Sequence, residues 1–197
     1  IGDSSNEMGD NLTAIDLGTG RTAKAISGRD SSTCALLDNG QLKCWGKNFR
    51  GILGQGHTNN IGDSSNEMGD NLTAIDLGTG RTATAIAVGG HACALLDNGQ
   101  LKCWGNNAYG QLGLGNDTNH IGDGSNEMGD NLTSVNLGNG RTATAIFVGA
   151  SMNCALLDNS EVKCWGDNNG CKLGKGHSNR IGDDPNEMGD NLTILDL

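Results

Sequence analysis

A period of about sixty residues dominates this sequence and limits the folds available to it. One segment, Ile-Gly-Asp-x-x-Asn-Glu-Met-Gly-Asp-Asn-Leu-Thr, occurs four times and begins at Ile1, Ile61, Ile121 and Ile181. A second motif, Cys-Ala-Leu-Leu-Asp-Asn-x-x-x-Lys-Cys-Trp-Gly, occupies residues 34–46, 93–105 and 154–166. A repeat of this length, rich in glycine and short β-type runs, is typical of propeller blades and β-solenoids. We therefore predict repeats at 1–60, 61–120 and 121–180, and the start of a fourth at 181–197.

The second motif predicts a β-hairpin. Two short apolar runs flank Asp-Asn-Gly, and Gly99 can adopt the positive φ that closes such a turn. If the strands pair about Asn98, the opposed residues are Cys93 with Cys103, Ala94 with Lys102, and Leu95 with Leu101. Opposed residues in an antiparallel ladder have Cα atoms roughly 4.5–5.5 Å apart, within reach of a disulfide. The predicted bridges are Cys34–Cys44, Cys93–Cys103 and Cys154–Cys164.

The cysteine pattern also indicates a cellular compartment. Zinc sites favour Cys-x2–4-Cys spacing, and the four histidines do not recur beside the pairs, so disulfides are favoured over metal. Such bridges persist in oxidising surroundings, which predicts an extracellular or cell-surface protein. Cys171 is unpaired and replaces the glycine of the other copies. It is either an idle thiol or the partner in an intermolecular disulfide.

Composition excludes several partners. The net charge is −10. Binding to nucleic acids or anionic membranes requires clusters of Lys and Arg, so neither is an expected partner. No run of eighteen apolar residues is present, which predicts no membrane insertion. The start at Ile1, inside a repeated motif and without Met, suggests a processed or truncated chain.

Each repeat is expected to contain four short strands. In the second repeat, alternation of apolar and polar residues and turn-forming glycines place them at 71–77, 82–88, 91–96 and 100–105. No segment has a 3.6-residue apolar period, so almost no helix is predicted. The fold class is therefore all-β, with four-stranded antiparallel units resembling propeller blades.

The residues also resemble a known family. His91-Ala-Cys-Ala-Leu-Leu-Asp-Asn-Gly-Gln-Leu-Lys-Cys-Trp-Gly105, followed by Asn107-Ala-Tyr-Gly-Gln-Leu-Gly113, is similar to the repeat of the regulator of chromosome condensation (RCC1) family. The disulfide variant resembles secreted RCC1-like repeats rather than the nuclear exchange factor. Ser32 and Met152 replace the family histidine in the other copies, and the Tyr-Gly-Gln-Leu-Gly loop also differs there. The exchange activity is not expected here, because a fold does not transfer function.

The blade interpretation assigns roles to apolar residues. Ala94, Leu95 and Leu101 are expected to form the apolar face between neighbouring blades. Trp104 is expected to close the blade edge, with its indole N–H bonded to a loop carbonyl. A sugar-stacking role for this tryptophan is the alternative.

Two sets of polar residues are candidate sites. Asn-x-Thr occurs at Asn11, Asn71, Asn131, Asn191 and, outside the period, Asn116; these are predicted N-glycosylation acceptors, unless duplication merely copied a harmless tripeptide. Asp63, Asn66, Glu67 and Asp70 are oxygen ligands that either bind Ca²⁺ or serve as loop residues. No catalytic motif is recognisable. We predict no enzyme activity, no metal site and no cofactor.

Three repeats are too few to close a propeller ring, which needs about four to eight blades. An open array leaves edges unpaired, and such edges recruit partners. The favoured function is a non-catalytic, glycosylated extracellular structural protein that assembles with itself into a filament or surface array. The alternative is a monomeric β-propeller scaffold that recognises a protein or glycan through its loops.

Overall fold

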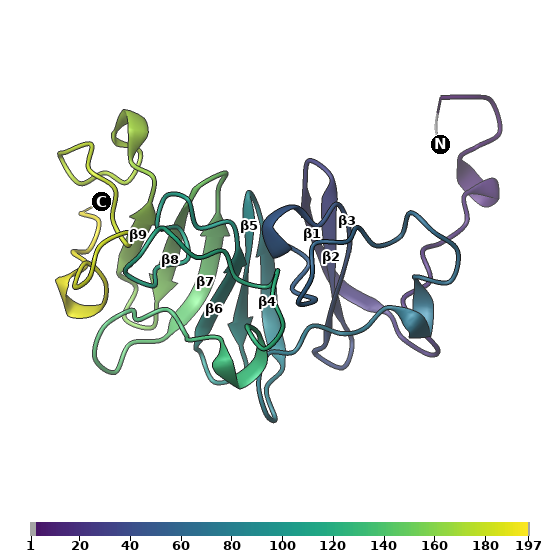
Figure 1. Ribbon diagram of the computed structural model, residues 1–197, viewed down its shortest axis with the longest axis horizontal. Coiled ribbons are helices and arrows are strands. Elements are labelled where there is room, and N and C mark those ends of the chain that lie inside the picture. The colour runs from purple at the N-terminus through teal and green to yellow at the C-terminus, as the bar shows by residue number, and fades with distance from the viewer. Residues whose placement is uncertain (1–2, 197) are drawn as a thin grey trace.

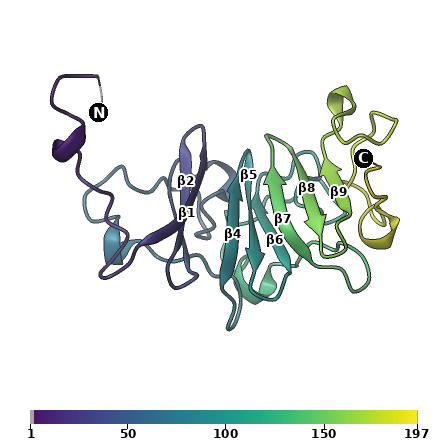
Figure 2. The same ribbon diagram turned by 180° about the vertical axis from the view of Figure 1, so that it is seen from behind.

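The fold consists of three antiparallel sheets, one from each repeat, in a computed structural model that describes residues 3–196. The first sheet contains β1 (Ala23–Arg29), β2 (Ser32–Leu37) and β3 (Leu42–Gly46). The second contains β4 (Ala83–Val88), β5 (His91–Leu96) and β6 (Leu101–Gly105), and the third β7 (Ala143–Val148), β8 (Met152–Leu157) and β9 (Val162–Gly166). The sheets stand side by side along the long axis in chain order, as Figures 1 and 2 show from opposite sides.

The predicted hairpin register is confirmed. In the second repeat the opposed pairs are Cys93 with Cys103, Ala94 with Lys102, and Leu95 with Leu101. Disulfides join Cys34 to Cys44, Cys93 to Cys103, and Cys154 to Cys164, with Cα separations of 4.0, 4.1 and 4.1 Å. Each hairpin is therefore closed covalently near its open end, and the second cysteine directly precedes the tryptophan on the same strand.

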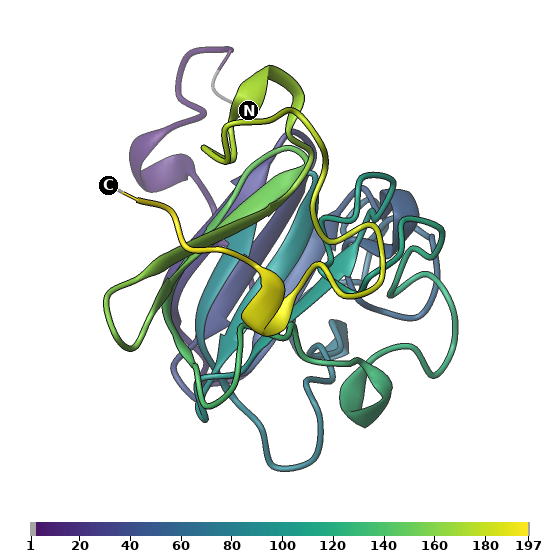
Figure 3. The same cartoon turned by 90° about the vertical axis from the view of Figure 1, so that its left-hand side faces the viewer.

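Neighbouring sheets pack face to face. Strand β4 lies against β1 and β2, and β7 lies against β4 and β5, so the sheets appear one behind another in Figure 3. Both faces of the middle sheet are buried. Ala94 packs in the core between the first and second sheets, whereas Leu95 and Leu101 pack between the second and third. The expectation that these three residues share a face is wrong, because consecutive residues in a strand point to opposite faces.

The units have three strands rather than the expected four. Asn71 ends the 3-10 turn Gly69–Asn71, and residues 72–77 form no strand. The Ile75 amide donates to the Leu42 carbonyl in β3 at 2.8 Å, but Gln55 Nε2 occupies the Thr73 carbonyl at 2.9 Å. The Gln55 side chain thus occupies a carbonyl that would otherwise be free to accept a backbone hydrogen bond from a neighbouring strand. The segment lies beside the preceding repeat without extending its sheet.

Helical structure is limited to single 3-10 turns, as the sequence predicts. Among residues 3–196 these are η1 (Gly9–Asn11), η2 (Phe49–Gly51), η3 (Gly69–Asn71), η4 (Gly129–Asn131), η5 (Asn169–Cys171) and η6 (Gly189–Asn191). Within that range, no helix has the length and apolarity needed to span a membrane.

The tryptophans join successive repeats. Trp104 is fully buried, and its Nε1 donates to the Ile52 carbonyl of the first repeat at 2.9 Å. Trp165 makes the equivalent bond to the Gln111 carbonyl at 3.0 Å. The prediction of an indole bonded to a loop carbonyl is confirmed, and the carbonyl belongs to the preceding repeat. This burial leaves no indole face for stacking on a sugar at Trp104 or Trp165.

Candidate interaction surfaces

The repeated Ile-Gly-Asp segments, which we call opening segments, attach each repeat to the one before it. Asp130 accepts hydrogen bonds from the Thr79 amide and hydroxyl at 2.9 and 2.6 Å, and the Gly129 amide donates to the Asp76 carbonyl at 3.1 Å. These bonds hold the pKa of Asp130 below its usual value. Asp70 and Asp190 bond equivalently to the repeats before them. The near-identity of the opening segments is therefore explained by packing within one chain.

A buried lysine strengthens each junction. Lys102 is 6% exposed, and its Nζ donates to the carbonyls of Leu77 and Gly129 at 3.0 and 2.8 Å. Lys43 and Lys163 make the same pair of bonds one repeat earlier and later. Burial of this charge lowers the pKa of Lys102, while Asp130 and Asp76 oppose the shift. The sequence reasoning missed this role, although the lysine recurs with the cysteines.

The candidate Ca²⁺ ligands do not converge. Glu67 accepts the amides of Gly62 and Ser64 at 2.7 and 3.0 Å, while Asp70 faces Thr19 in the preceding repeat. Asn66 has a φ of +67° and shapes the turn. In residues 3–196, no group of three His, Cys, Asp or Glu side chains is placed to hold a metal ion. These residues act as loop and junction residues here.

The candidate acceptor asparagines lie at the surface. Asn11, Asn71, Asn131 and Asn191 are exposed, whereas Asn116 is half-buried and its carbonyl accepts from Asn107 Nδ2 at 2.8 Å. The side chains of Asn11 and Asn191 each donate to a carbonyl five residues earlier. Nothing in this geometry assigns a glycan, and the acceptor role stays a prediction.

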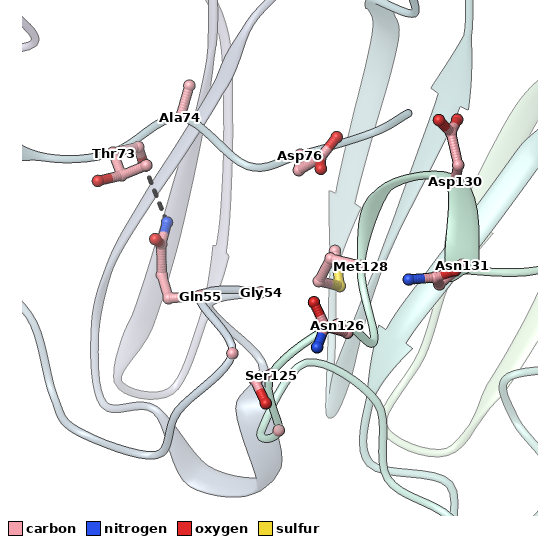
Figure 4. Close-up of a pocket in the computed structure, with 12 residues that line it drawn as sticks. Gly54, Gln55, Thr73, Ala74, Asp76, Ser125, Asn126, Met128, Asp130 and Asn131 are labelled. Atoms are coloured by element: carbon pink, nitrogen blue, oxygen red, sulfur yellow. Dashed lines mark hydrogen bonds between the residues drawn. The ribbon is translucent and has the colours of Figure 1, made fainter. Parts of the chain in front are cut away.

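Two equivalent polar grooves follow the opening segments. The first has a volume of about 480 Å³ and lies between Gln55, Asp76 and Asn131 (Figure 4). The second, of about 820 Å³, is lined by the corresponding residues one repeat later, including Asn116 and Asn191. Three of the five candidate acceptors therefore border these grooves.

A buried polar cluster joins the second and third repeats. His91 Nε2 lies 2.7 Å from Asn153 Oδ1, and Asn153 Nδ2 donates to the Gln111 carbonyl at 2.6 Å. Because Asn153 Oδ1 can only accept, His91 must carry its proton on Nε2. Its Nδ1 has no partner among the described residues. Burial lowers the pKa of His91 to about 4, and the bond with Asn153 opposes the shift.

The loops after the third strands have one frame in all repeats. We call residues 47–60, 106–120 and 167–180 the variable loops. Asn48 is fully buried; its Oδ1 accepts the Leu53 amide at 2.9 Å, and its Nδ2 donates to the His57 carbonyl at 2.6 Å. Asn107 and Asn168 accept and donate equivalent bonds. A buried asparagine thus fixes the loop path independently of the outward side chains.

The outward positions of this frame carry different side chains. Phe49 is 70% exposed, and the Arg50 guanidinium lies 4.7 Å from its ring centre. In the second variable loop Tyr109 is 37% exposed, and Arg180 stacks on it at 4.7 Å. In the third, Cys171 is an exposed free thiol. The sequence reasoning missed Phe49, because one aromatic residue in a loop carries no periodic signal.

Comparison with known proteins agrees with this architecture. Residues 25–52, 85–111 and 143–171 match the model of the regulator of chromosome condensation (RCC1) repeat. E3 ubiquitin-protein ligase HERC2 of Homo sapiens is 27% identical over 176 residues, which cover 89% of this chain and 3% of that protein. The chain thus spans a small part of this relative, whose activity belongs to a much longer protein.

Two solved structures share the fold. The crystal structure of human WBSCR16 matches with a TM-score of 0.60 at 17% identity, over 92% of this chain and 42% of that one. Yeast RCC1 (Prp20), solved bound to Kap60, matches with a TM-score of 0.59 at 16% identity, over 89% and 37%. Fold and loops together define an all-β repeat protein built from propeller-type units. In particular, three segments of the chain are similar to the RCC1 repeat, and each of them contains one disulfide.

Proposed function

We propose that this chain is a non-catalytic extracellular scaffold that binds a protein partner through its variable loops. The observation that carries the proposal is the contrast within each loop between a fixed frame and changing outward side chains. Asn48 and its equivalents hold the same backbone bonds, while Phe49, Ala108 and Asn169 stand at the same outward position. Recognition surfaces combine a rigid frame with variable loop residues in this way. The disulfides are compatible with an oxidising compartment, which supports the extracellular assignment.

Selection from a displayed random-peptide library tests this proposal. Peptides are selected on the intact chain, and their affinities are then measured for Phe49→Ala and Tyr109→Ala. Phe147→Ala is the matched control, since Phe147 is 61% exposed but lies on β7. Loop variants should lose about tenfold or more in affinity, the scale of an interface hot spot. Peptides that depend on Phe147 and on neither loop residue would contradict the proposal.

Self-assembly is the second candidate, and exposed apolar side chains at the ends of the array favour it. Leu156 is 39% exposed on β8, whereas Leu95, its equivalent between repeats, is 6% exposed. At the other end of the array, Ile26 is 66% exposed. Ile15 there is 54% exposed, whereas Ile75, its equivalent in the second repeat, is 6% exposed. A second copy can cover these faces as one repeat covers the next, which gives a filament.

Sedimentation velocity over a range of concentrations and negative-stain microscopy test the second candidate. Assembly predicts growing species and fibres, both lost in Leu156→Glu, because a buried carboxylate at the junction is costly. Ser160→Glu, in the exposed turn after β8, is the charge-matched control. A monomer at every concentration would exclude assembly by this route.

We further propose that the exposed acceptor asparagines carry glycans when the chain is secreted from a eukaryotic cell. Intact mass before and after enzymatic deglycosylation measures their occupancy. An unchanged mass would remove the prediction for Asn11, Asn71, Asn131 and Asn191. Cys171 remains the candidate intermolecular thiol, and dimers on a non-reducing gel that are lost in Cys171→Ser would support that role.

A further inference from the structure

The first variable loop carries an exposed aromatic ring that borders two hollows. Phe49 and Lys47 line two hollows, one of about 430 Å³ that is also lined by Arg50, and one of about 150 Å³ that is also lined by Arg29. We call these four residues and the two hollows the Phe49 site. Its aromatic ring is the most exposed large apolar side chain among residues 3–196. Phe49 lines both hollows.

Backbone strain is retained at this site. Arg50 has a φ of +57°, in the left-handed region where a side chain costs about 1–2 kcal/mol. The third repeat has Gly170 at the equivalent position, with a φ of +77°. The fold therefore accepts glycine there, and the arginine is not needed for the backbone path. Glycine would adopt this conformation at lower energy, so the presence of arginine indicates a role for the Arg50 side chain itself.

The Arg50 side chain is held in place. Its Nη1 donates to Asn106 Oδ1 at 2.5 Å in the second repeat, and its guanidinium stacks on Phe49. Arginine has five N–H donors, so several remain for a ligand. A guanidinium that is already oriented loses little entropy on binding a carboxylate.

The charge around the Phe49 site is unlike that of the rest of the chain. Residues 1–60 contain six acidic and six basic side chains, so the whole net charge of −10 comes from residues 61–197. Arg29, Lys47 and Arg50 border the hollows, together with the carboxylates of Asp30 and Asp123. Arg29 pairs with exposed Asp30 at 3.7 Å, while Lys47 has no carboxylate partner among the described residues. The hollows thus have three cationic and two anionic side chains, and Lys47 and Arg50 form no ion pair among the described residues, so both are available to an anion.

We propose that the Phe49 site binds an extended acidic segment of a partner protein that carries apolar side chains between its carboxylates. The apolar side chains enter the hollows beside the Phe49 ring, and the carboxylates bond to Lys47 and Arg50. Cations next to an exposed aromatic ring suit such a segment, since carboxylate bonds give orientation and apolar burial gives affinity. This inference rests on the proposed recognition function and names the chemistry of its partner.

Fluorescence anisotropy tests the site with a defined probe. The probe is a short fluorescein-labelled peptide of Glu and Leu, and a Lys and Leu peptide of equal length is the charge control. Phe49→Ala and Lys47→Glu should each weaken binding of the acidic probe about tenfold or more. Phe147→Ala removes another exposed ring, and Lys24→Glu reverses an exposed charge on β1; both variants should bind like the unchanged chain. Binding of the acidic probe should also weaken as salt is raised.

Arg50→Gly separates recognition from folding. Relief of the left-handed backbone should leave the urea midpoint unchanged or higher, while affinity for the acidic probe falls. Loss of stability without loss of affinity would assign Arg50 to the fold and overturn its role in binding. Equal binding of both peptides, or equal loss in Phe49→Ala and Phe147→Ala, would overturn the site.

The outcomes separate this inference from the broader proposal. Library peptides that depend on Tyr109 but not on Phe49 would leave the recognition function standing and reject the Phe49 site. A chain that binds neither library peptides nor the acidic probe through any variable loop would reject both.

Discussion

Acidification should weaken the junction between the second and third repeats through one buried histidine. The pKa of His91 is lowered from 6.5 to about 4 by its burial, so the folded chain takes up this proton less readily than the unfolded chain. Neutral His91 therefore contributes to the free energy of unfolding. This contribution is complete above the pKa of His91 in the unfolded chain, and it is lost as the pH falls toward the pKa of His91 in the folded chain. The shift corresponds to about 3 kcal/mol.

Urea unfolding followed by tryptophan fluorescence measures this loss, because Trp104 and Trp165 lie buried at the junctions. The free energy of unfolding is compared between pH 7 and pH 4 for the unchanged chain and for His91→Gln. Glutamine keeps a donor for Asn153 and does not titrate in this range. Groups common to both proteins cancel, so the unchanged chain should lose about 3 kcal/mol more than the variant.

Equal pH dependence in the two proteins would refute the reasoning. It would mean that His91 is protonated in the folded chain without penalty. A nuclear magnetic resonance titration of the His91 ring gives an independent reading, and a midpoint near 6.5 in the folded state would lead to the same conclusion.

Three further substitutions test the junctions and the hairpins by urea unfolding. Lys102→Met keeps the apolar stem but leaves the Leu77 carbonyl without a donor and the Gly129 carbonyl with the Leu132 amide alone, which should cost about 1–3 kcal/mol; exposed Lys24→Met should change little, and equal effects would contradict the lysine's role. Trp104→Phe should cost about 1–3 kcal/mol through loss of the bond to Ile52, whereas Trp45→Phe should cost less, because Trp45 has no such bond within residues 3–196. The double change Cys93→Ser and Cys103→Ser should cost roughly 2–3 kcal/mol, and an unaltered midpoint would show that the bridge does not restrain the unfolded chain.

Local patterns in the sequence were enough to predict the hairpins. The Asp-Asn-Gly turn and the alternation of side chains set the pairing of Leu95 with Leu101, because strand register follows from turn position. Residues 71–77 have a similar alternation, yet they form no strand, since their backbone groups bond to Leu42 and Gln55 of the preceding repeat. An extended pattern predicts exposure and burial but not the partner of each amide and carbonyl.

The repeat pattern alone did not explain why the opening segments are nearly identical. That identity favours assembly between chains when only the sequence is considered. In the fold, Asp130 bonds to Thr79 and Lys102 bonds to Leu77 and Gly129, so the same residues are required inside one chain. The evidence for function therefore moves to the variable loops, where the shared asparagine frame does not require the outward side chains of Phe49 and Tyr109.

The sequence by itself determined the sixty-residue repeat, the all-β character, the hairpin register and the position of each cysteine pair. These features depend on residues about ten positions apart, where a turn and a two-residue alternation fix geometry. Only the tertiary structure decided the acceptors of Lys102, the partner of Asp130 and the grouping of Arg29 with Lys47 and Phe49. Such contacts join residues 27 and 51 positions apart in the chain, and stacking of one sheet on the next determines which of them meet.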